Sequence, residues 1–209
     1  MQFDENVRSR LIVVLDYQPR WADEYAEIER GLQATLAGAA LSIDHIGSTS
    51  VPGLGAKDVI DVQITIADLD DAASIQSRLL ARGFRDRGGV RYDEFYGMGA
   101  ANAELRKRYF REPEGARRTH LHVRELGRFN YRYALLFRDY LRASREACVA
   151  YETLKRRAAQ LFPDNIDGYL LIKEPALHLI YEAASLWATQ TRWQSPDVAD
   201  HAAASAARG

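Results

Sequence analysis

Hydrophobic and polar residues alternate along several short segments in the first half of the chain. The clearest case is residues 59–66, where β-branched residues occupy every second position. One face of this predicted strand is therefore apolar, and the other carries Asp61 and Gln63. Similar runs, bounded by glycine or polar residues, favour strands at six places. These are residues 11–15, 42–46, 59–66, 83–95, 105–111 and 117–124.

Helical periodicity lies between these strands. From Pro19 to Gly38 apolar residues recur every three or four positions, which is typical of an amphipathic helix. Proline suits the first turn of a helix, and glycine suits its end. A shorter helix is predicted over residues 70–81.

The second half of the chain is predicted to be helical. From Tyr131 to Leu161 an apolar stripe of helical period continues, as one helix or as two with a single break, and Pro163 ends it. Aromatic residues on this stripe, such as Phe137, are expected in the core. A last helix is predicted to begin near Pro175.

This order of elements predicts an α+β fold, in which a mixed β-sheet is flanked by helices. We expect a single domain over residues 11–188. Residues 189–209 are rich in alanine, serine and aspartate without an apolar period, and are expected to be a flexible tail.

The composition narrows the function classes. The net charge of −1 argues against broad nucleic-acid binding or attraction to an acidic membrane, which need a strong basic excess. Cys148 is the only cysteine, which excludes an intrachain disulfide and a cysteine-based zinc site. No segment is apolar and long enough to span a bilayer, and the N-terminus lacks a signal-type stretch. We expect a cytoplasmic protein with no membrane attachment.

A glycine-containing turn and an aspartate form the first candidate site. Gly47 and Ser48 follow a predicted strand, and such a turn directs backbone N–H groups and a hydroxyl toward phosphate. Asp61, on the polar face of the next strand, is a candidate ligand for Mg²⁺ beside a triphosphate. The alternatives are a plain strand-to-helix turn and an exposed aspartate.

Two histidines form the second candidate site. His120 and His122 alternate with apolar residues, so both imidazoles share one strand face, where they can bind metal, move protons or contact phosphate. A simple packing pair is the alternative. Basic residues gather in the same β-rich region, which favours a polyanionic small ligand. They are Arg106, Lys107, Arg108, Arg111, Arg117, Arg118 and Arg124.

Several segments resemble the GrpB family. The main one runs over residues 44–54, Asp-His-Ile-Gly-Ser-Thr-Ser-Val-Pro-Gly-Leu, and is followed by Lys57 and the strand Ile-Asp-Val-Gln-Ile at 60–64. Later segments agree in the same order up to about residue 187. They are Arg-Tyr-Phe-Arg at 108–111, Thr-His-Leu-His-Val at 119–123, Phe-Arg-Asp-Tyr-Leu-Arg at 137–142, Tyr151 with Leu154 and Lys155, and Tyr169 with Lys173.

The resemblance implies a nucleotidyltransferase-like fold. In that superfamily a Gly-Ser turn precedes a strand with two metal-binding carboxylates. Gly47 and Ser48 match the turn and Asp61 matches the first carboxylate, whereas Gln63 stands at the second as a neutral, weaker ligand. The family also occurs fused to dephospho-CoA kinase. The chain itself has no Gly-x-x-x-x-Gly-Lys-Ser/Thr sequence, so it is not that kinase.

Two functional hypotheses follow. In the first, the protein binds a nucleoside triphosphate with Mg²⁺ and transfers a nucleotidyl or phosphoryl group to a small-molecule acceptor, or activates it. Asp61, His120 and His122 are then catalytic, and Asp61 and Gln63 hold metal. The phosphates contact the turn and two basic residues, namely Gly47, Ser48, Thr49, Ser50, Lys57 and Arg108. In the second hypothesis the fold is a non-catalytic module that binds a ligand or a protein.

Overall fold

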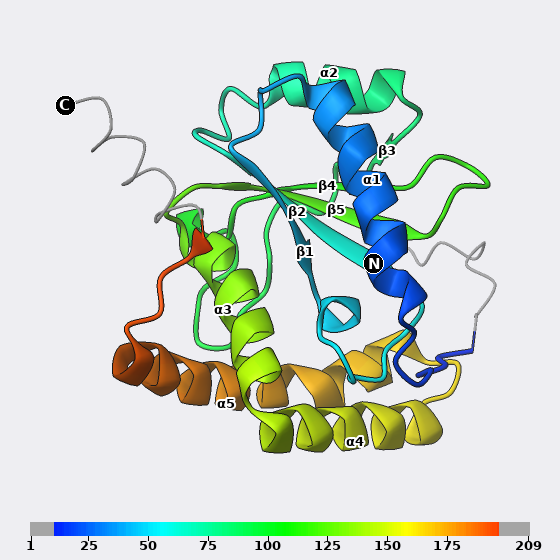
Figure 1. Cartoon of the computed structure of the whole chain (residues 1–209), viewed down its shortest axis with the longest axis vertical. Helices are drawn as coiled ribbons and strands as arrows, with labels where there is room; N and C mark the ends of the chain where they lie inside the picture. The colour runs from blue at the N-terminus through cyan, green and yellow to red at the C-terminus, as the bar shows by residue number, and fades with distance from the viewer. Residues whose placement is uncertain (1–10, 197–209) are drawn as a thin grey trace.

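The computed structural model describes residues 11–196, which form a mixed sheet with helices on both sides (Figure 1). The strands are β1 (Ser42–Ile46), β2 (Ile60–Ile66), β3 (Arg85–Asp86), β4 (Arg108–Arg111) and β5 (Thr119–Glu125). The helices are α1 (Arg20–Leu36), α2 (Ala73–Ala81), α3 (Phe129–Ala143), α4 (Arg145–Leu161) and α5 (Ile166–Thr191). Short 3₁₀ turns lie at η1 (Ser48–Ser50) and η2 (Ala103–Leu105). The predicted α+β class is confirmed.

The five strands lie in the order β1-β2-β5-β4-β3. Only β2 and β5 pair in parallel, and the other three pairs are antiparallel. The parallel register places Asp61 beside His120 and Gln63 beside His122. The polar residues of both strands therefore meet on one face of the sheet, because side chains of paired residues point the same way.

The other face of the sheet carries the main hydrophobic core. Alternate residues of β2 pack there with Leu121 and Val123 of β5, against Trp21 and Leu36 of α1 and Leu79 of α2. Burial of this continuous apolar surface is the main stabilising term for such a layer. The polar face is covered instead by the helical second half. Figure 1 shows α4 and α5 together below the sheet, with α3 rising from them alongside β1.

Of the two alternatives for the long helical stripe, the structure has two helices, with the break at Ser144. Its side-chain oxygen accepts a hydrogen bond from the backbone N–H of Ala147 and caps α4. The stripe aromatics pack together, since Phe137 lies against the buried ring of Tyr151. Phe137 itself is only partly buried and faces a cavity, so the prediction that it lies in the core is met only in part.

Two predicted strands are wrong or too long. Residues 11–15 form only an isolated bridge, Leu15 to Ala56, because Val14 packs against α4 and α5 rather than joining the sheet. Of residues 83–95, only Arg85–Asp86 forms a strand, and Tyr92 forms an isolated bridge with Arg106. The partner of this strand, β4, is four residues long, and glycines at 88 and 89 interrupt the extended chain.

The last helix begins nine residues earlier than Pro175. Asn165 caps α5 through a hydrogen bond from Gly168, and Pro175 lies inside the helix on its exposed side. The helix also continues to Thr191, past the expected boundary at 188. Beyond it, Ser195 is buried and accepts a hydrogen bond from the Tyr131 hydroxyl at 2.8 Å. The rest of the predicted tail, from residue 197, lies outside the described residues. Within residues 11–196, no helix is long and apolar enough to cross a membrane.

Candidate functional site

The turn after β1 brings its backbone directly against Asp61. Gly47 has φ 71° and ψ −174°, a conformation open essentially to glycine alone. A β-carbon at this position would lie 2.5 Å from Oδ2 of Asp61. The glycine is therefore required twice, by its backbone angle and by the carboxylate beside it.

Asp61, His120 and His122 form one cluster. Oδ1 of Asp61 lies 3.1 Å from Nδ1 of His120 and 3.8 Å from Nε2 of His122. Burial alone would raise the pKa of Asp61, but its interactions with the two imidazoles hold it well below its usual value. Burial also lowers the pKa of His122 to about 4, so this imidazole is neutral near pH 7. The cluster offers one ionised carboxylate and nitrogen lone pairs, and its ligand atoms all lie within 4.8 Å of one another, close enough to share a metal ion.

A cavity of about 520 Å³ opens above this cluster, between the polar face of the sheet and helices α3 to α5. Asp61 is its one lining carboxylate among the described residues. Six basic side chains also line it, and all of them are at least half-buried. They are Lys57, Arg111, Arg118, Arg124, Lys155 and Lys173. Two of them are already paired with carboxylates, Arg111 with Glu112 and Arg124 with Asp93. The wall still carries one carboxylate against six basic side chains, which favours an anionic ligand.

Two of the lysines are chemically unusual. Burial, with Lys173 nearby, lowers the pKa of Lys155 to about 7 and that of Lys57 to about 8. The ammonium of Lys155 lies 3.0 Å from Oγ of Ser48 and 2.5 Å from the carbonyl oxygen of Gly55. The predicted phosphate-binding hydroxyl of Ser48 is thus held next to a cation from α4.

Most of the predicted site residues line this cavity, and others form hydrogen bonds elsewhere in the protein. Gly47, Ser48, Lys57, Asp61 and both histidines line the cavity. The Thr49 hydroxyl donates to the carbonyl of Val59, and the Ser50 hydroxyl donates to the carbonyl of Gly47 at 2.6 Å. Ser50 therefore stabilises the turn and does not line the cavity, whereas Thr49 stabilises the turn and also lines the cavity.

Gln63 lies on the expected sheet face, but it is fully buried and has a different partner. Its Oε1 accepts a hydrogen bond from Nη1 of Arg124 at 2.7 Å, and its amide nitrogen lies 3.4 Å from the carbonyl of Tyr131. The positive charge of this guanidinium would repel a metal cation at the same oxygen. The geometry does not fit the predicted ligand role.

Arg108 lies on the wrong face for the predicted phosphate contact. It pairs with Val123, a residue of the apolar core, and lines a separate cavity with Arg91 and Arg106. Arg111, three residues later, faces the Asp61 cavity instead, because side chains alternate along β4.

Sequence reasoning included Lys155 and Lys173 in the family resemblance but assigned no role in the site to the helical half. Lys155 and Lys173 come from α4 and α5, far from the motif in sequence. One signal was available for Lys155, since it lies four residues after Tyr151 on the apolar stripe, where a lysine is out of place unless it is paired.

Comparisons with known proteins agree on one family. The family model described as GrpB protein matches residues 11–183. A dephospho-CoA kinase of Mycolicibacterium paratuberculosis is 34% identical over 189 residues, which cover 84% of this chain and 46% of that protein. The UPF0157 protein YqkA of Bacillus subtilis is 29% identical over 178 residues, covering 85% and 48%. The chain thus spans about half the length of these curated relatives.

A solved structure shows the same similarity. The conserved protein GrpB from Enterococcus faecalis aligns with a TM-score of 0.69 and 30% identity, over 84% of this chain and 99% of that chain. The alignment therefore takes in nearly all of that protein.

Proposed function

The chain belongs to the GrpB family, and we propose that it binds a nucleoside triphosphate with a divalent cation and transfers a nucleotidyl or phosphoryl group to a small molecule. The observation that supports this most is the pairing of the Asp61–His120–His122 cluster with a cavity rich in lysine and arginine. A polyphosphate with a bound cation has the matching charges, because its oxygens suit the basic wall and its metal suits Asp61.

The donor set fits a divalent cation. Asp61 supplies one carboxylate oxygen, and His120 and His122 supply one imidazole nitrogen each. Mg²⁺ prefers oxygen and would rely on Asp61 and phosphate, whereas Mn²⁺ also accepts imidazole. A bound cation of either kind would neutralise phosphate charge and polarise the reacting phosphorus.

The side chains have separable roles in this proposal. Ser48 and the backbone of the turn hold phosphate oxygens, and Lys57 and Lys155 balance the charge that develops on them. An acceptor oxygen forms a bond to phosphorus while the bond to the leaving pyrophosphate or nucleoside diphosphate breaks. The proton of the acceptor passes to His120 or His122, in an arrangement where that imidazole does not coordinate the cation.

A non-catalytic binding module remains the second candidate function. It is favoured by Gln63, which replaces a carboxylate of the superfamily pattern and is bound to Arg124. The similarity to less than half of the proteins named dephospho-CoA kinase is compatible with a module that assists another domain. This module would bind the same polyanion and leave it unchanged.

Calorimetric titration with each nucleoside triphosphate, with and without Mg²⁺ or Mn²⁺, tests the binding part. A nucleotide at one hundred times its dissociation constant should add about 2.7 kcal/mol to the free energy of unfolding. Asp61→Asn should remove the part of the nucleotide affinity that depends on the divalent cation. Asp71→Asn, at an exposed aspartate outside the cavity, should not change it.

Product analysis then separates enzyme from module. Release of pyrophosphate or nucleoside diphosphate in the presence of candidate acceptors supports transfer. Metal-linked binding without any turnover favours the module. No metal-linked binding of any triphosphate rejects both forms of the nucleotide proposal.

A further inference from the structure

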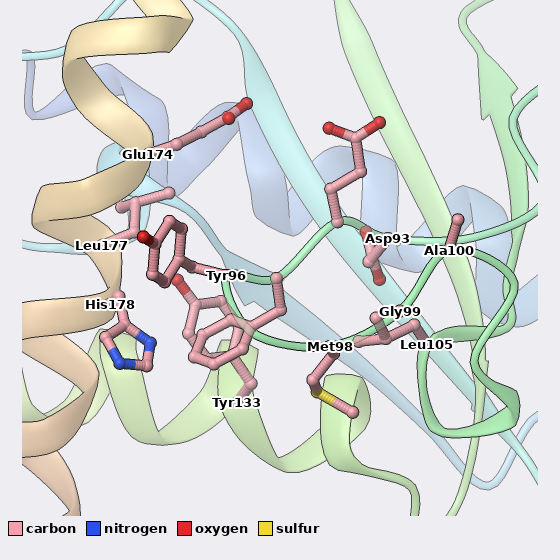
Figure 2. Close-up of a pocket in the computed structure, with 12 residues that line it drawn as sticks. Asp93, Tyr96, Met98, Gly99, Ala100, Leu105, Tyr133, Glu174, Leu177 and His178 are labelled. Atoms are coloured by element: carbon pink, nitrogen blue, oxygen red, sulfur yellow. The ribbon is translucent and has the colours of Figure 1, made fainter.

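A second cavity of about 310 Å³ adjoins the basic one (Figure 2). Figure 2 shows Glu174, Leu177 and His178 projecting from α5 on one side and Tyr133 from below. The segment from Asp93 to Ala100 closes the other side. This segment belongs to the long connection between β3 and β4.

The charge of this cavity is opposite to that of the first. Its described lining includes Asp93, Glu94 and Glu174, and no lysine or arginine. Asp93 is neutralised by ion pairs with Lys107 and Arg124. Glu94 and Glu174 are exposed and form no ion pair with any residue between 11 and 196. Two carboxylates thus remain available to a cationic ligand.

Aromatic rings supply the remaining wall. The Phe95 ring centre lies 4.7 Å from that of Phe129 and 5.3 Å from those of Tyr133 and Tyr181, so it anchors the connecting segment to α3 and α5. The next residue, Tyr96, is left 72% exposed at the cavity. Aromatic faces beside carboxylates are a favourable environment for an organic ammonium group.

His178 contributes an imidazole to this wall, and its Nε2 atom lies 3.8 Å from Oε1 of Glu182. Its Nδ1 atom is buried and has no hydrogen-bond partner among the described residues. The imidazole lies at the wall of this cavity, with ring centres 5.1 Å from Phe95 and 5.7 Å from Tyr96.

The two cavities meet at shared residues. Tyr133 and Leu177 line both of them. Arg124 lines the basic cavity and pairs at 2.9 Å with Asp93, which lines the acidic one. Ligands bound in the two cavities would therefore lie close to each other, on either side of Tyr133.

We propose that the second cavity is the acceptor subsite and that the acceptor is a small organic amine with an apolar or aromatic part. The assignment as acceptor rests on the proposed transfer function. The binding of an amine in this cavity does not, because it depends on Glu94, Glu174 and the aromatic wall alone.

Three probes of one shape test the charge preference. They are 2-phenylethylamine, 2-phenylethanol and phenylacetate, which share a ring and are cationic, neutral and anionic at pH 7. Ligand-observed NMR titrations use the full chain without nucleotide or metal, so failure here is distinct from failure of the nucleotide proposal. We expect the amine to bind most tightly and phenylacetate least.

Variants locate the binding. Glu174→Gln should weaken the amine about two- to fivefold, as expected for one exposed charge, without affecting phenylethanol. Glu27→Gln, at an exposed glutamate on α1, is the matched control and should change nothing. Equal binding of all three probes, no binding of the amine, or an amine affinity unchanged by Glu174→Gln would overturn the proposal.

A second arm tests the assignment as acceptor. If the amine binds at Glu174, amines with a hydroxyl should be modified when triphosphate and metal are supplied, and Asp61→Asn should stop this. Amine binding with no such product overturns the acceptor role and leaves a separate cation site.

Discussion

A β-carbon on residue 47 would stand 2.5 Å from Oδ2 of Asp61, so the turn and the carboxylate are fitted to each other. We expect Gly47→Ala to lower the free energy of unfolding by about 1–3 kcal/mol through backbone strain, and further through the clash. It should also abolish metal-linked nucleotide binding, since Asp61 must move. Urea denaturation and calorimetry measure the two effects.

Gly53→Ala is the control for this change. Gly53 also has a positive φ of 81°, but no atom lies within 4 Å of a β-carbon built there. Strain without collision should weaken folding less and leave nucleotide binding intact. Equal losses of binding in the two variants would show that the contact with Asp61 is not what matters.

Two arginines on opposite faces of the sheet offer a second prediction. Arg118 lines the basic cavity, whereas Arg108 lies on the apolar-core side. A hydrogen bond to a charged group contributes about 1.5–3 kcal/mol, so Arg118→Ala should weaken triphosphate binding about tenfold or more. Arg108→Ala should leave it unchanged. A larger effect at Arg108 would mean that the ligand binds on the other face.

The shared face of Asp61 and His120 could be predicted from the sequence because it depends only on local alternation. A strand with a period of two fixes which side chains point together, whatever the rest of the fold does. The same alternation also predicts which face of β4 carries Arg108. Phe110 is apolar and two residues away, so Arg108 had to share the core side of β4.

The remainder of the site depends on long-range packing. Nothing in the sequence near Ser48 indicates that Lys155, more than one hundred residues later, bonds to its hydroxyl. The hydrogen bond from Arg124 to Gln63 could not be predicted for the same reason, because the two residues lie on different strands. Residues 89–95 do not form the predicted strand, because β4 begins only at Arg108 and Tyr92 meets Arg106 in an isolated bridge. Local propensity cannot reveal the length of a partner strand.

Restoring the second carboxylate at residue 63 gives a third prediction. Because Oε1 of Gln63 is held by Arg124, Gln63→Glu should place its charge on that guanidinium rather than toward a metal. We expect unchanged affinity for Mn²⁺ and Mg²⁺. Stability should fall by about 1–3 kcal/mol, since the bond from the amide to Tyr131 is replaced by an unpaired contact in a buried site. Tighter metal binding would return residue 63 to the ligand set.

The last prediction concerns the pH dependence of anion binding. The pKa of Lys155 is lowered to about 7, chiefly by burial, so this lysine loses its charge in the free protein as the pH rises above 7. A bound polyphosphate favours the protonated form and raises this pKa. Pyrophosphate should therefore bind most tightly below pH 7, and binding above it should take up a proton.

The contribution of Lys155 to folding stability changes with pH in the opposite direction to its contribution to anion binding. The unfolded chain keeps Lys155 protonated up to its ordinary pKa near 10.5, whereas the folded chain releases the proton near 7. The unfolded state thus binds more protons between these values, and the contribution of Lys155 to stability rises with pH across that window. Below pH 7 the cost of the buried charge is constant.

Lys155→Met tests the predicted pH dependence of both pyrophosphate binding and folding stability. Without pyrophosphate, the variant should be more stable than the parent chain near pH 7, and the difference should shrink toward pH 10. Its pyrophosphate binding should be weaker at pH 6 and should depend less on pH, with a residual slope from Lys57, whose pKa is lowered to about 8. Arg157→Gln, at an exposed position on the same helix, is the control for a lost surface charge. Calorimetry in buffers of different ionisation enthalpy counts the protons directly, and a proton count unchanged by Lys155→Met would exclude Lys155 as the titrating group.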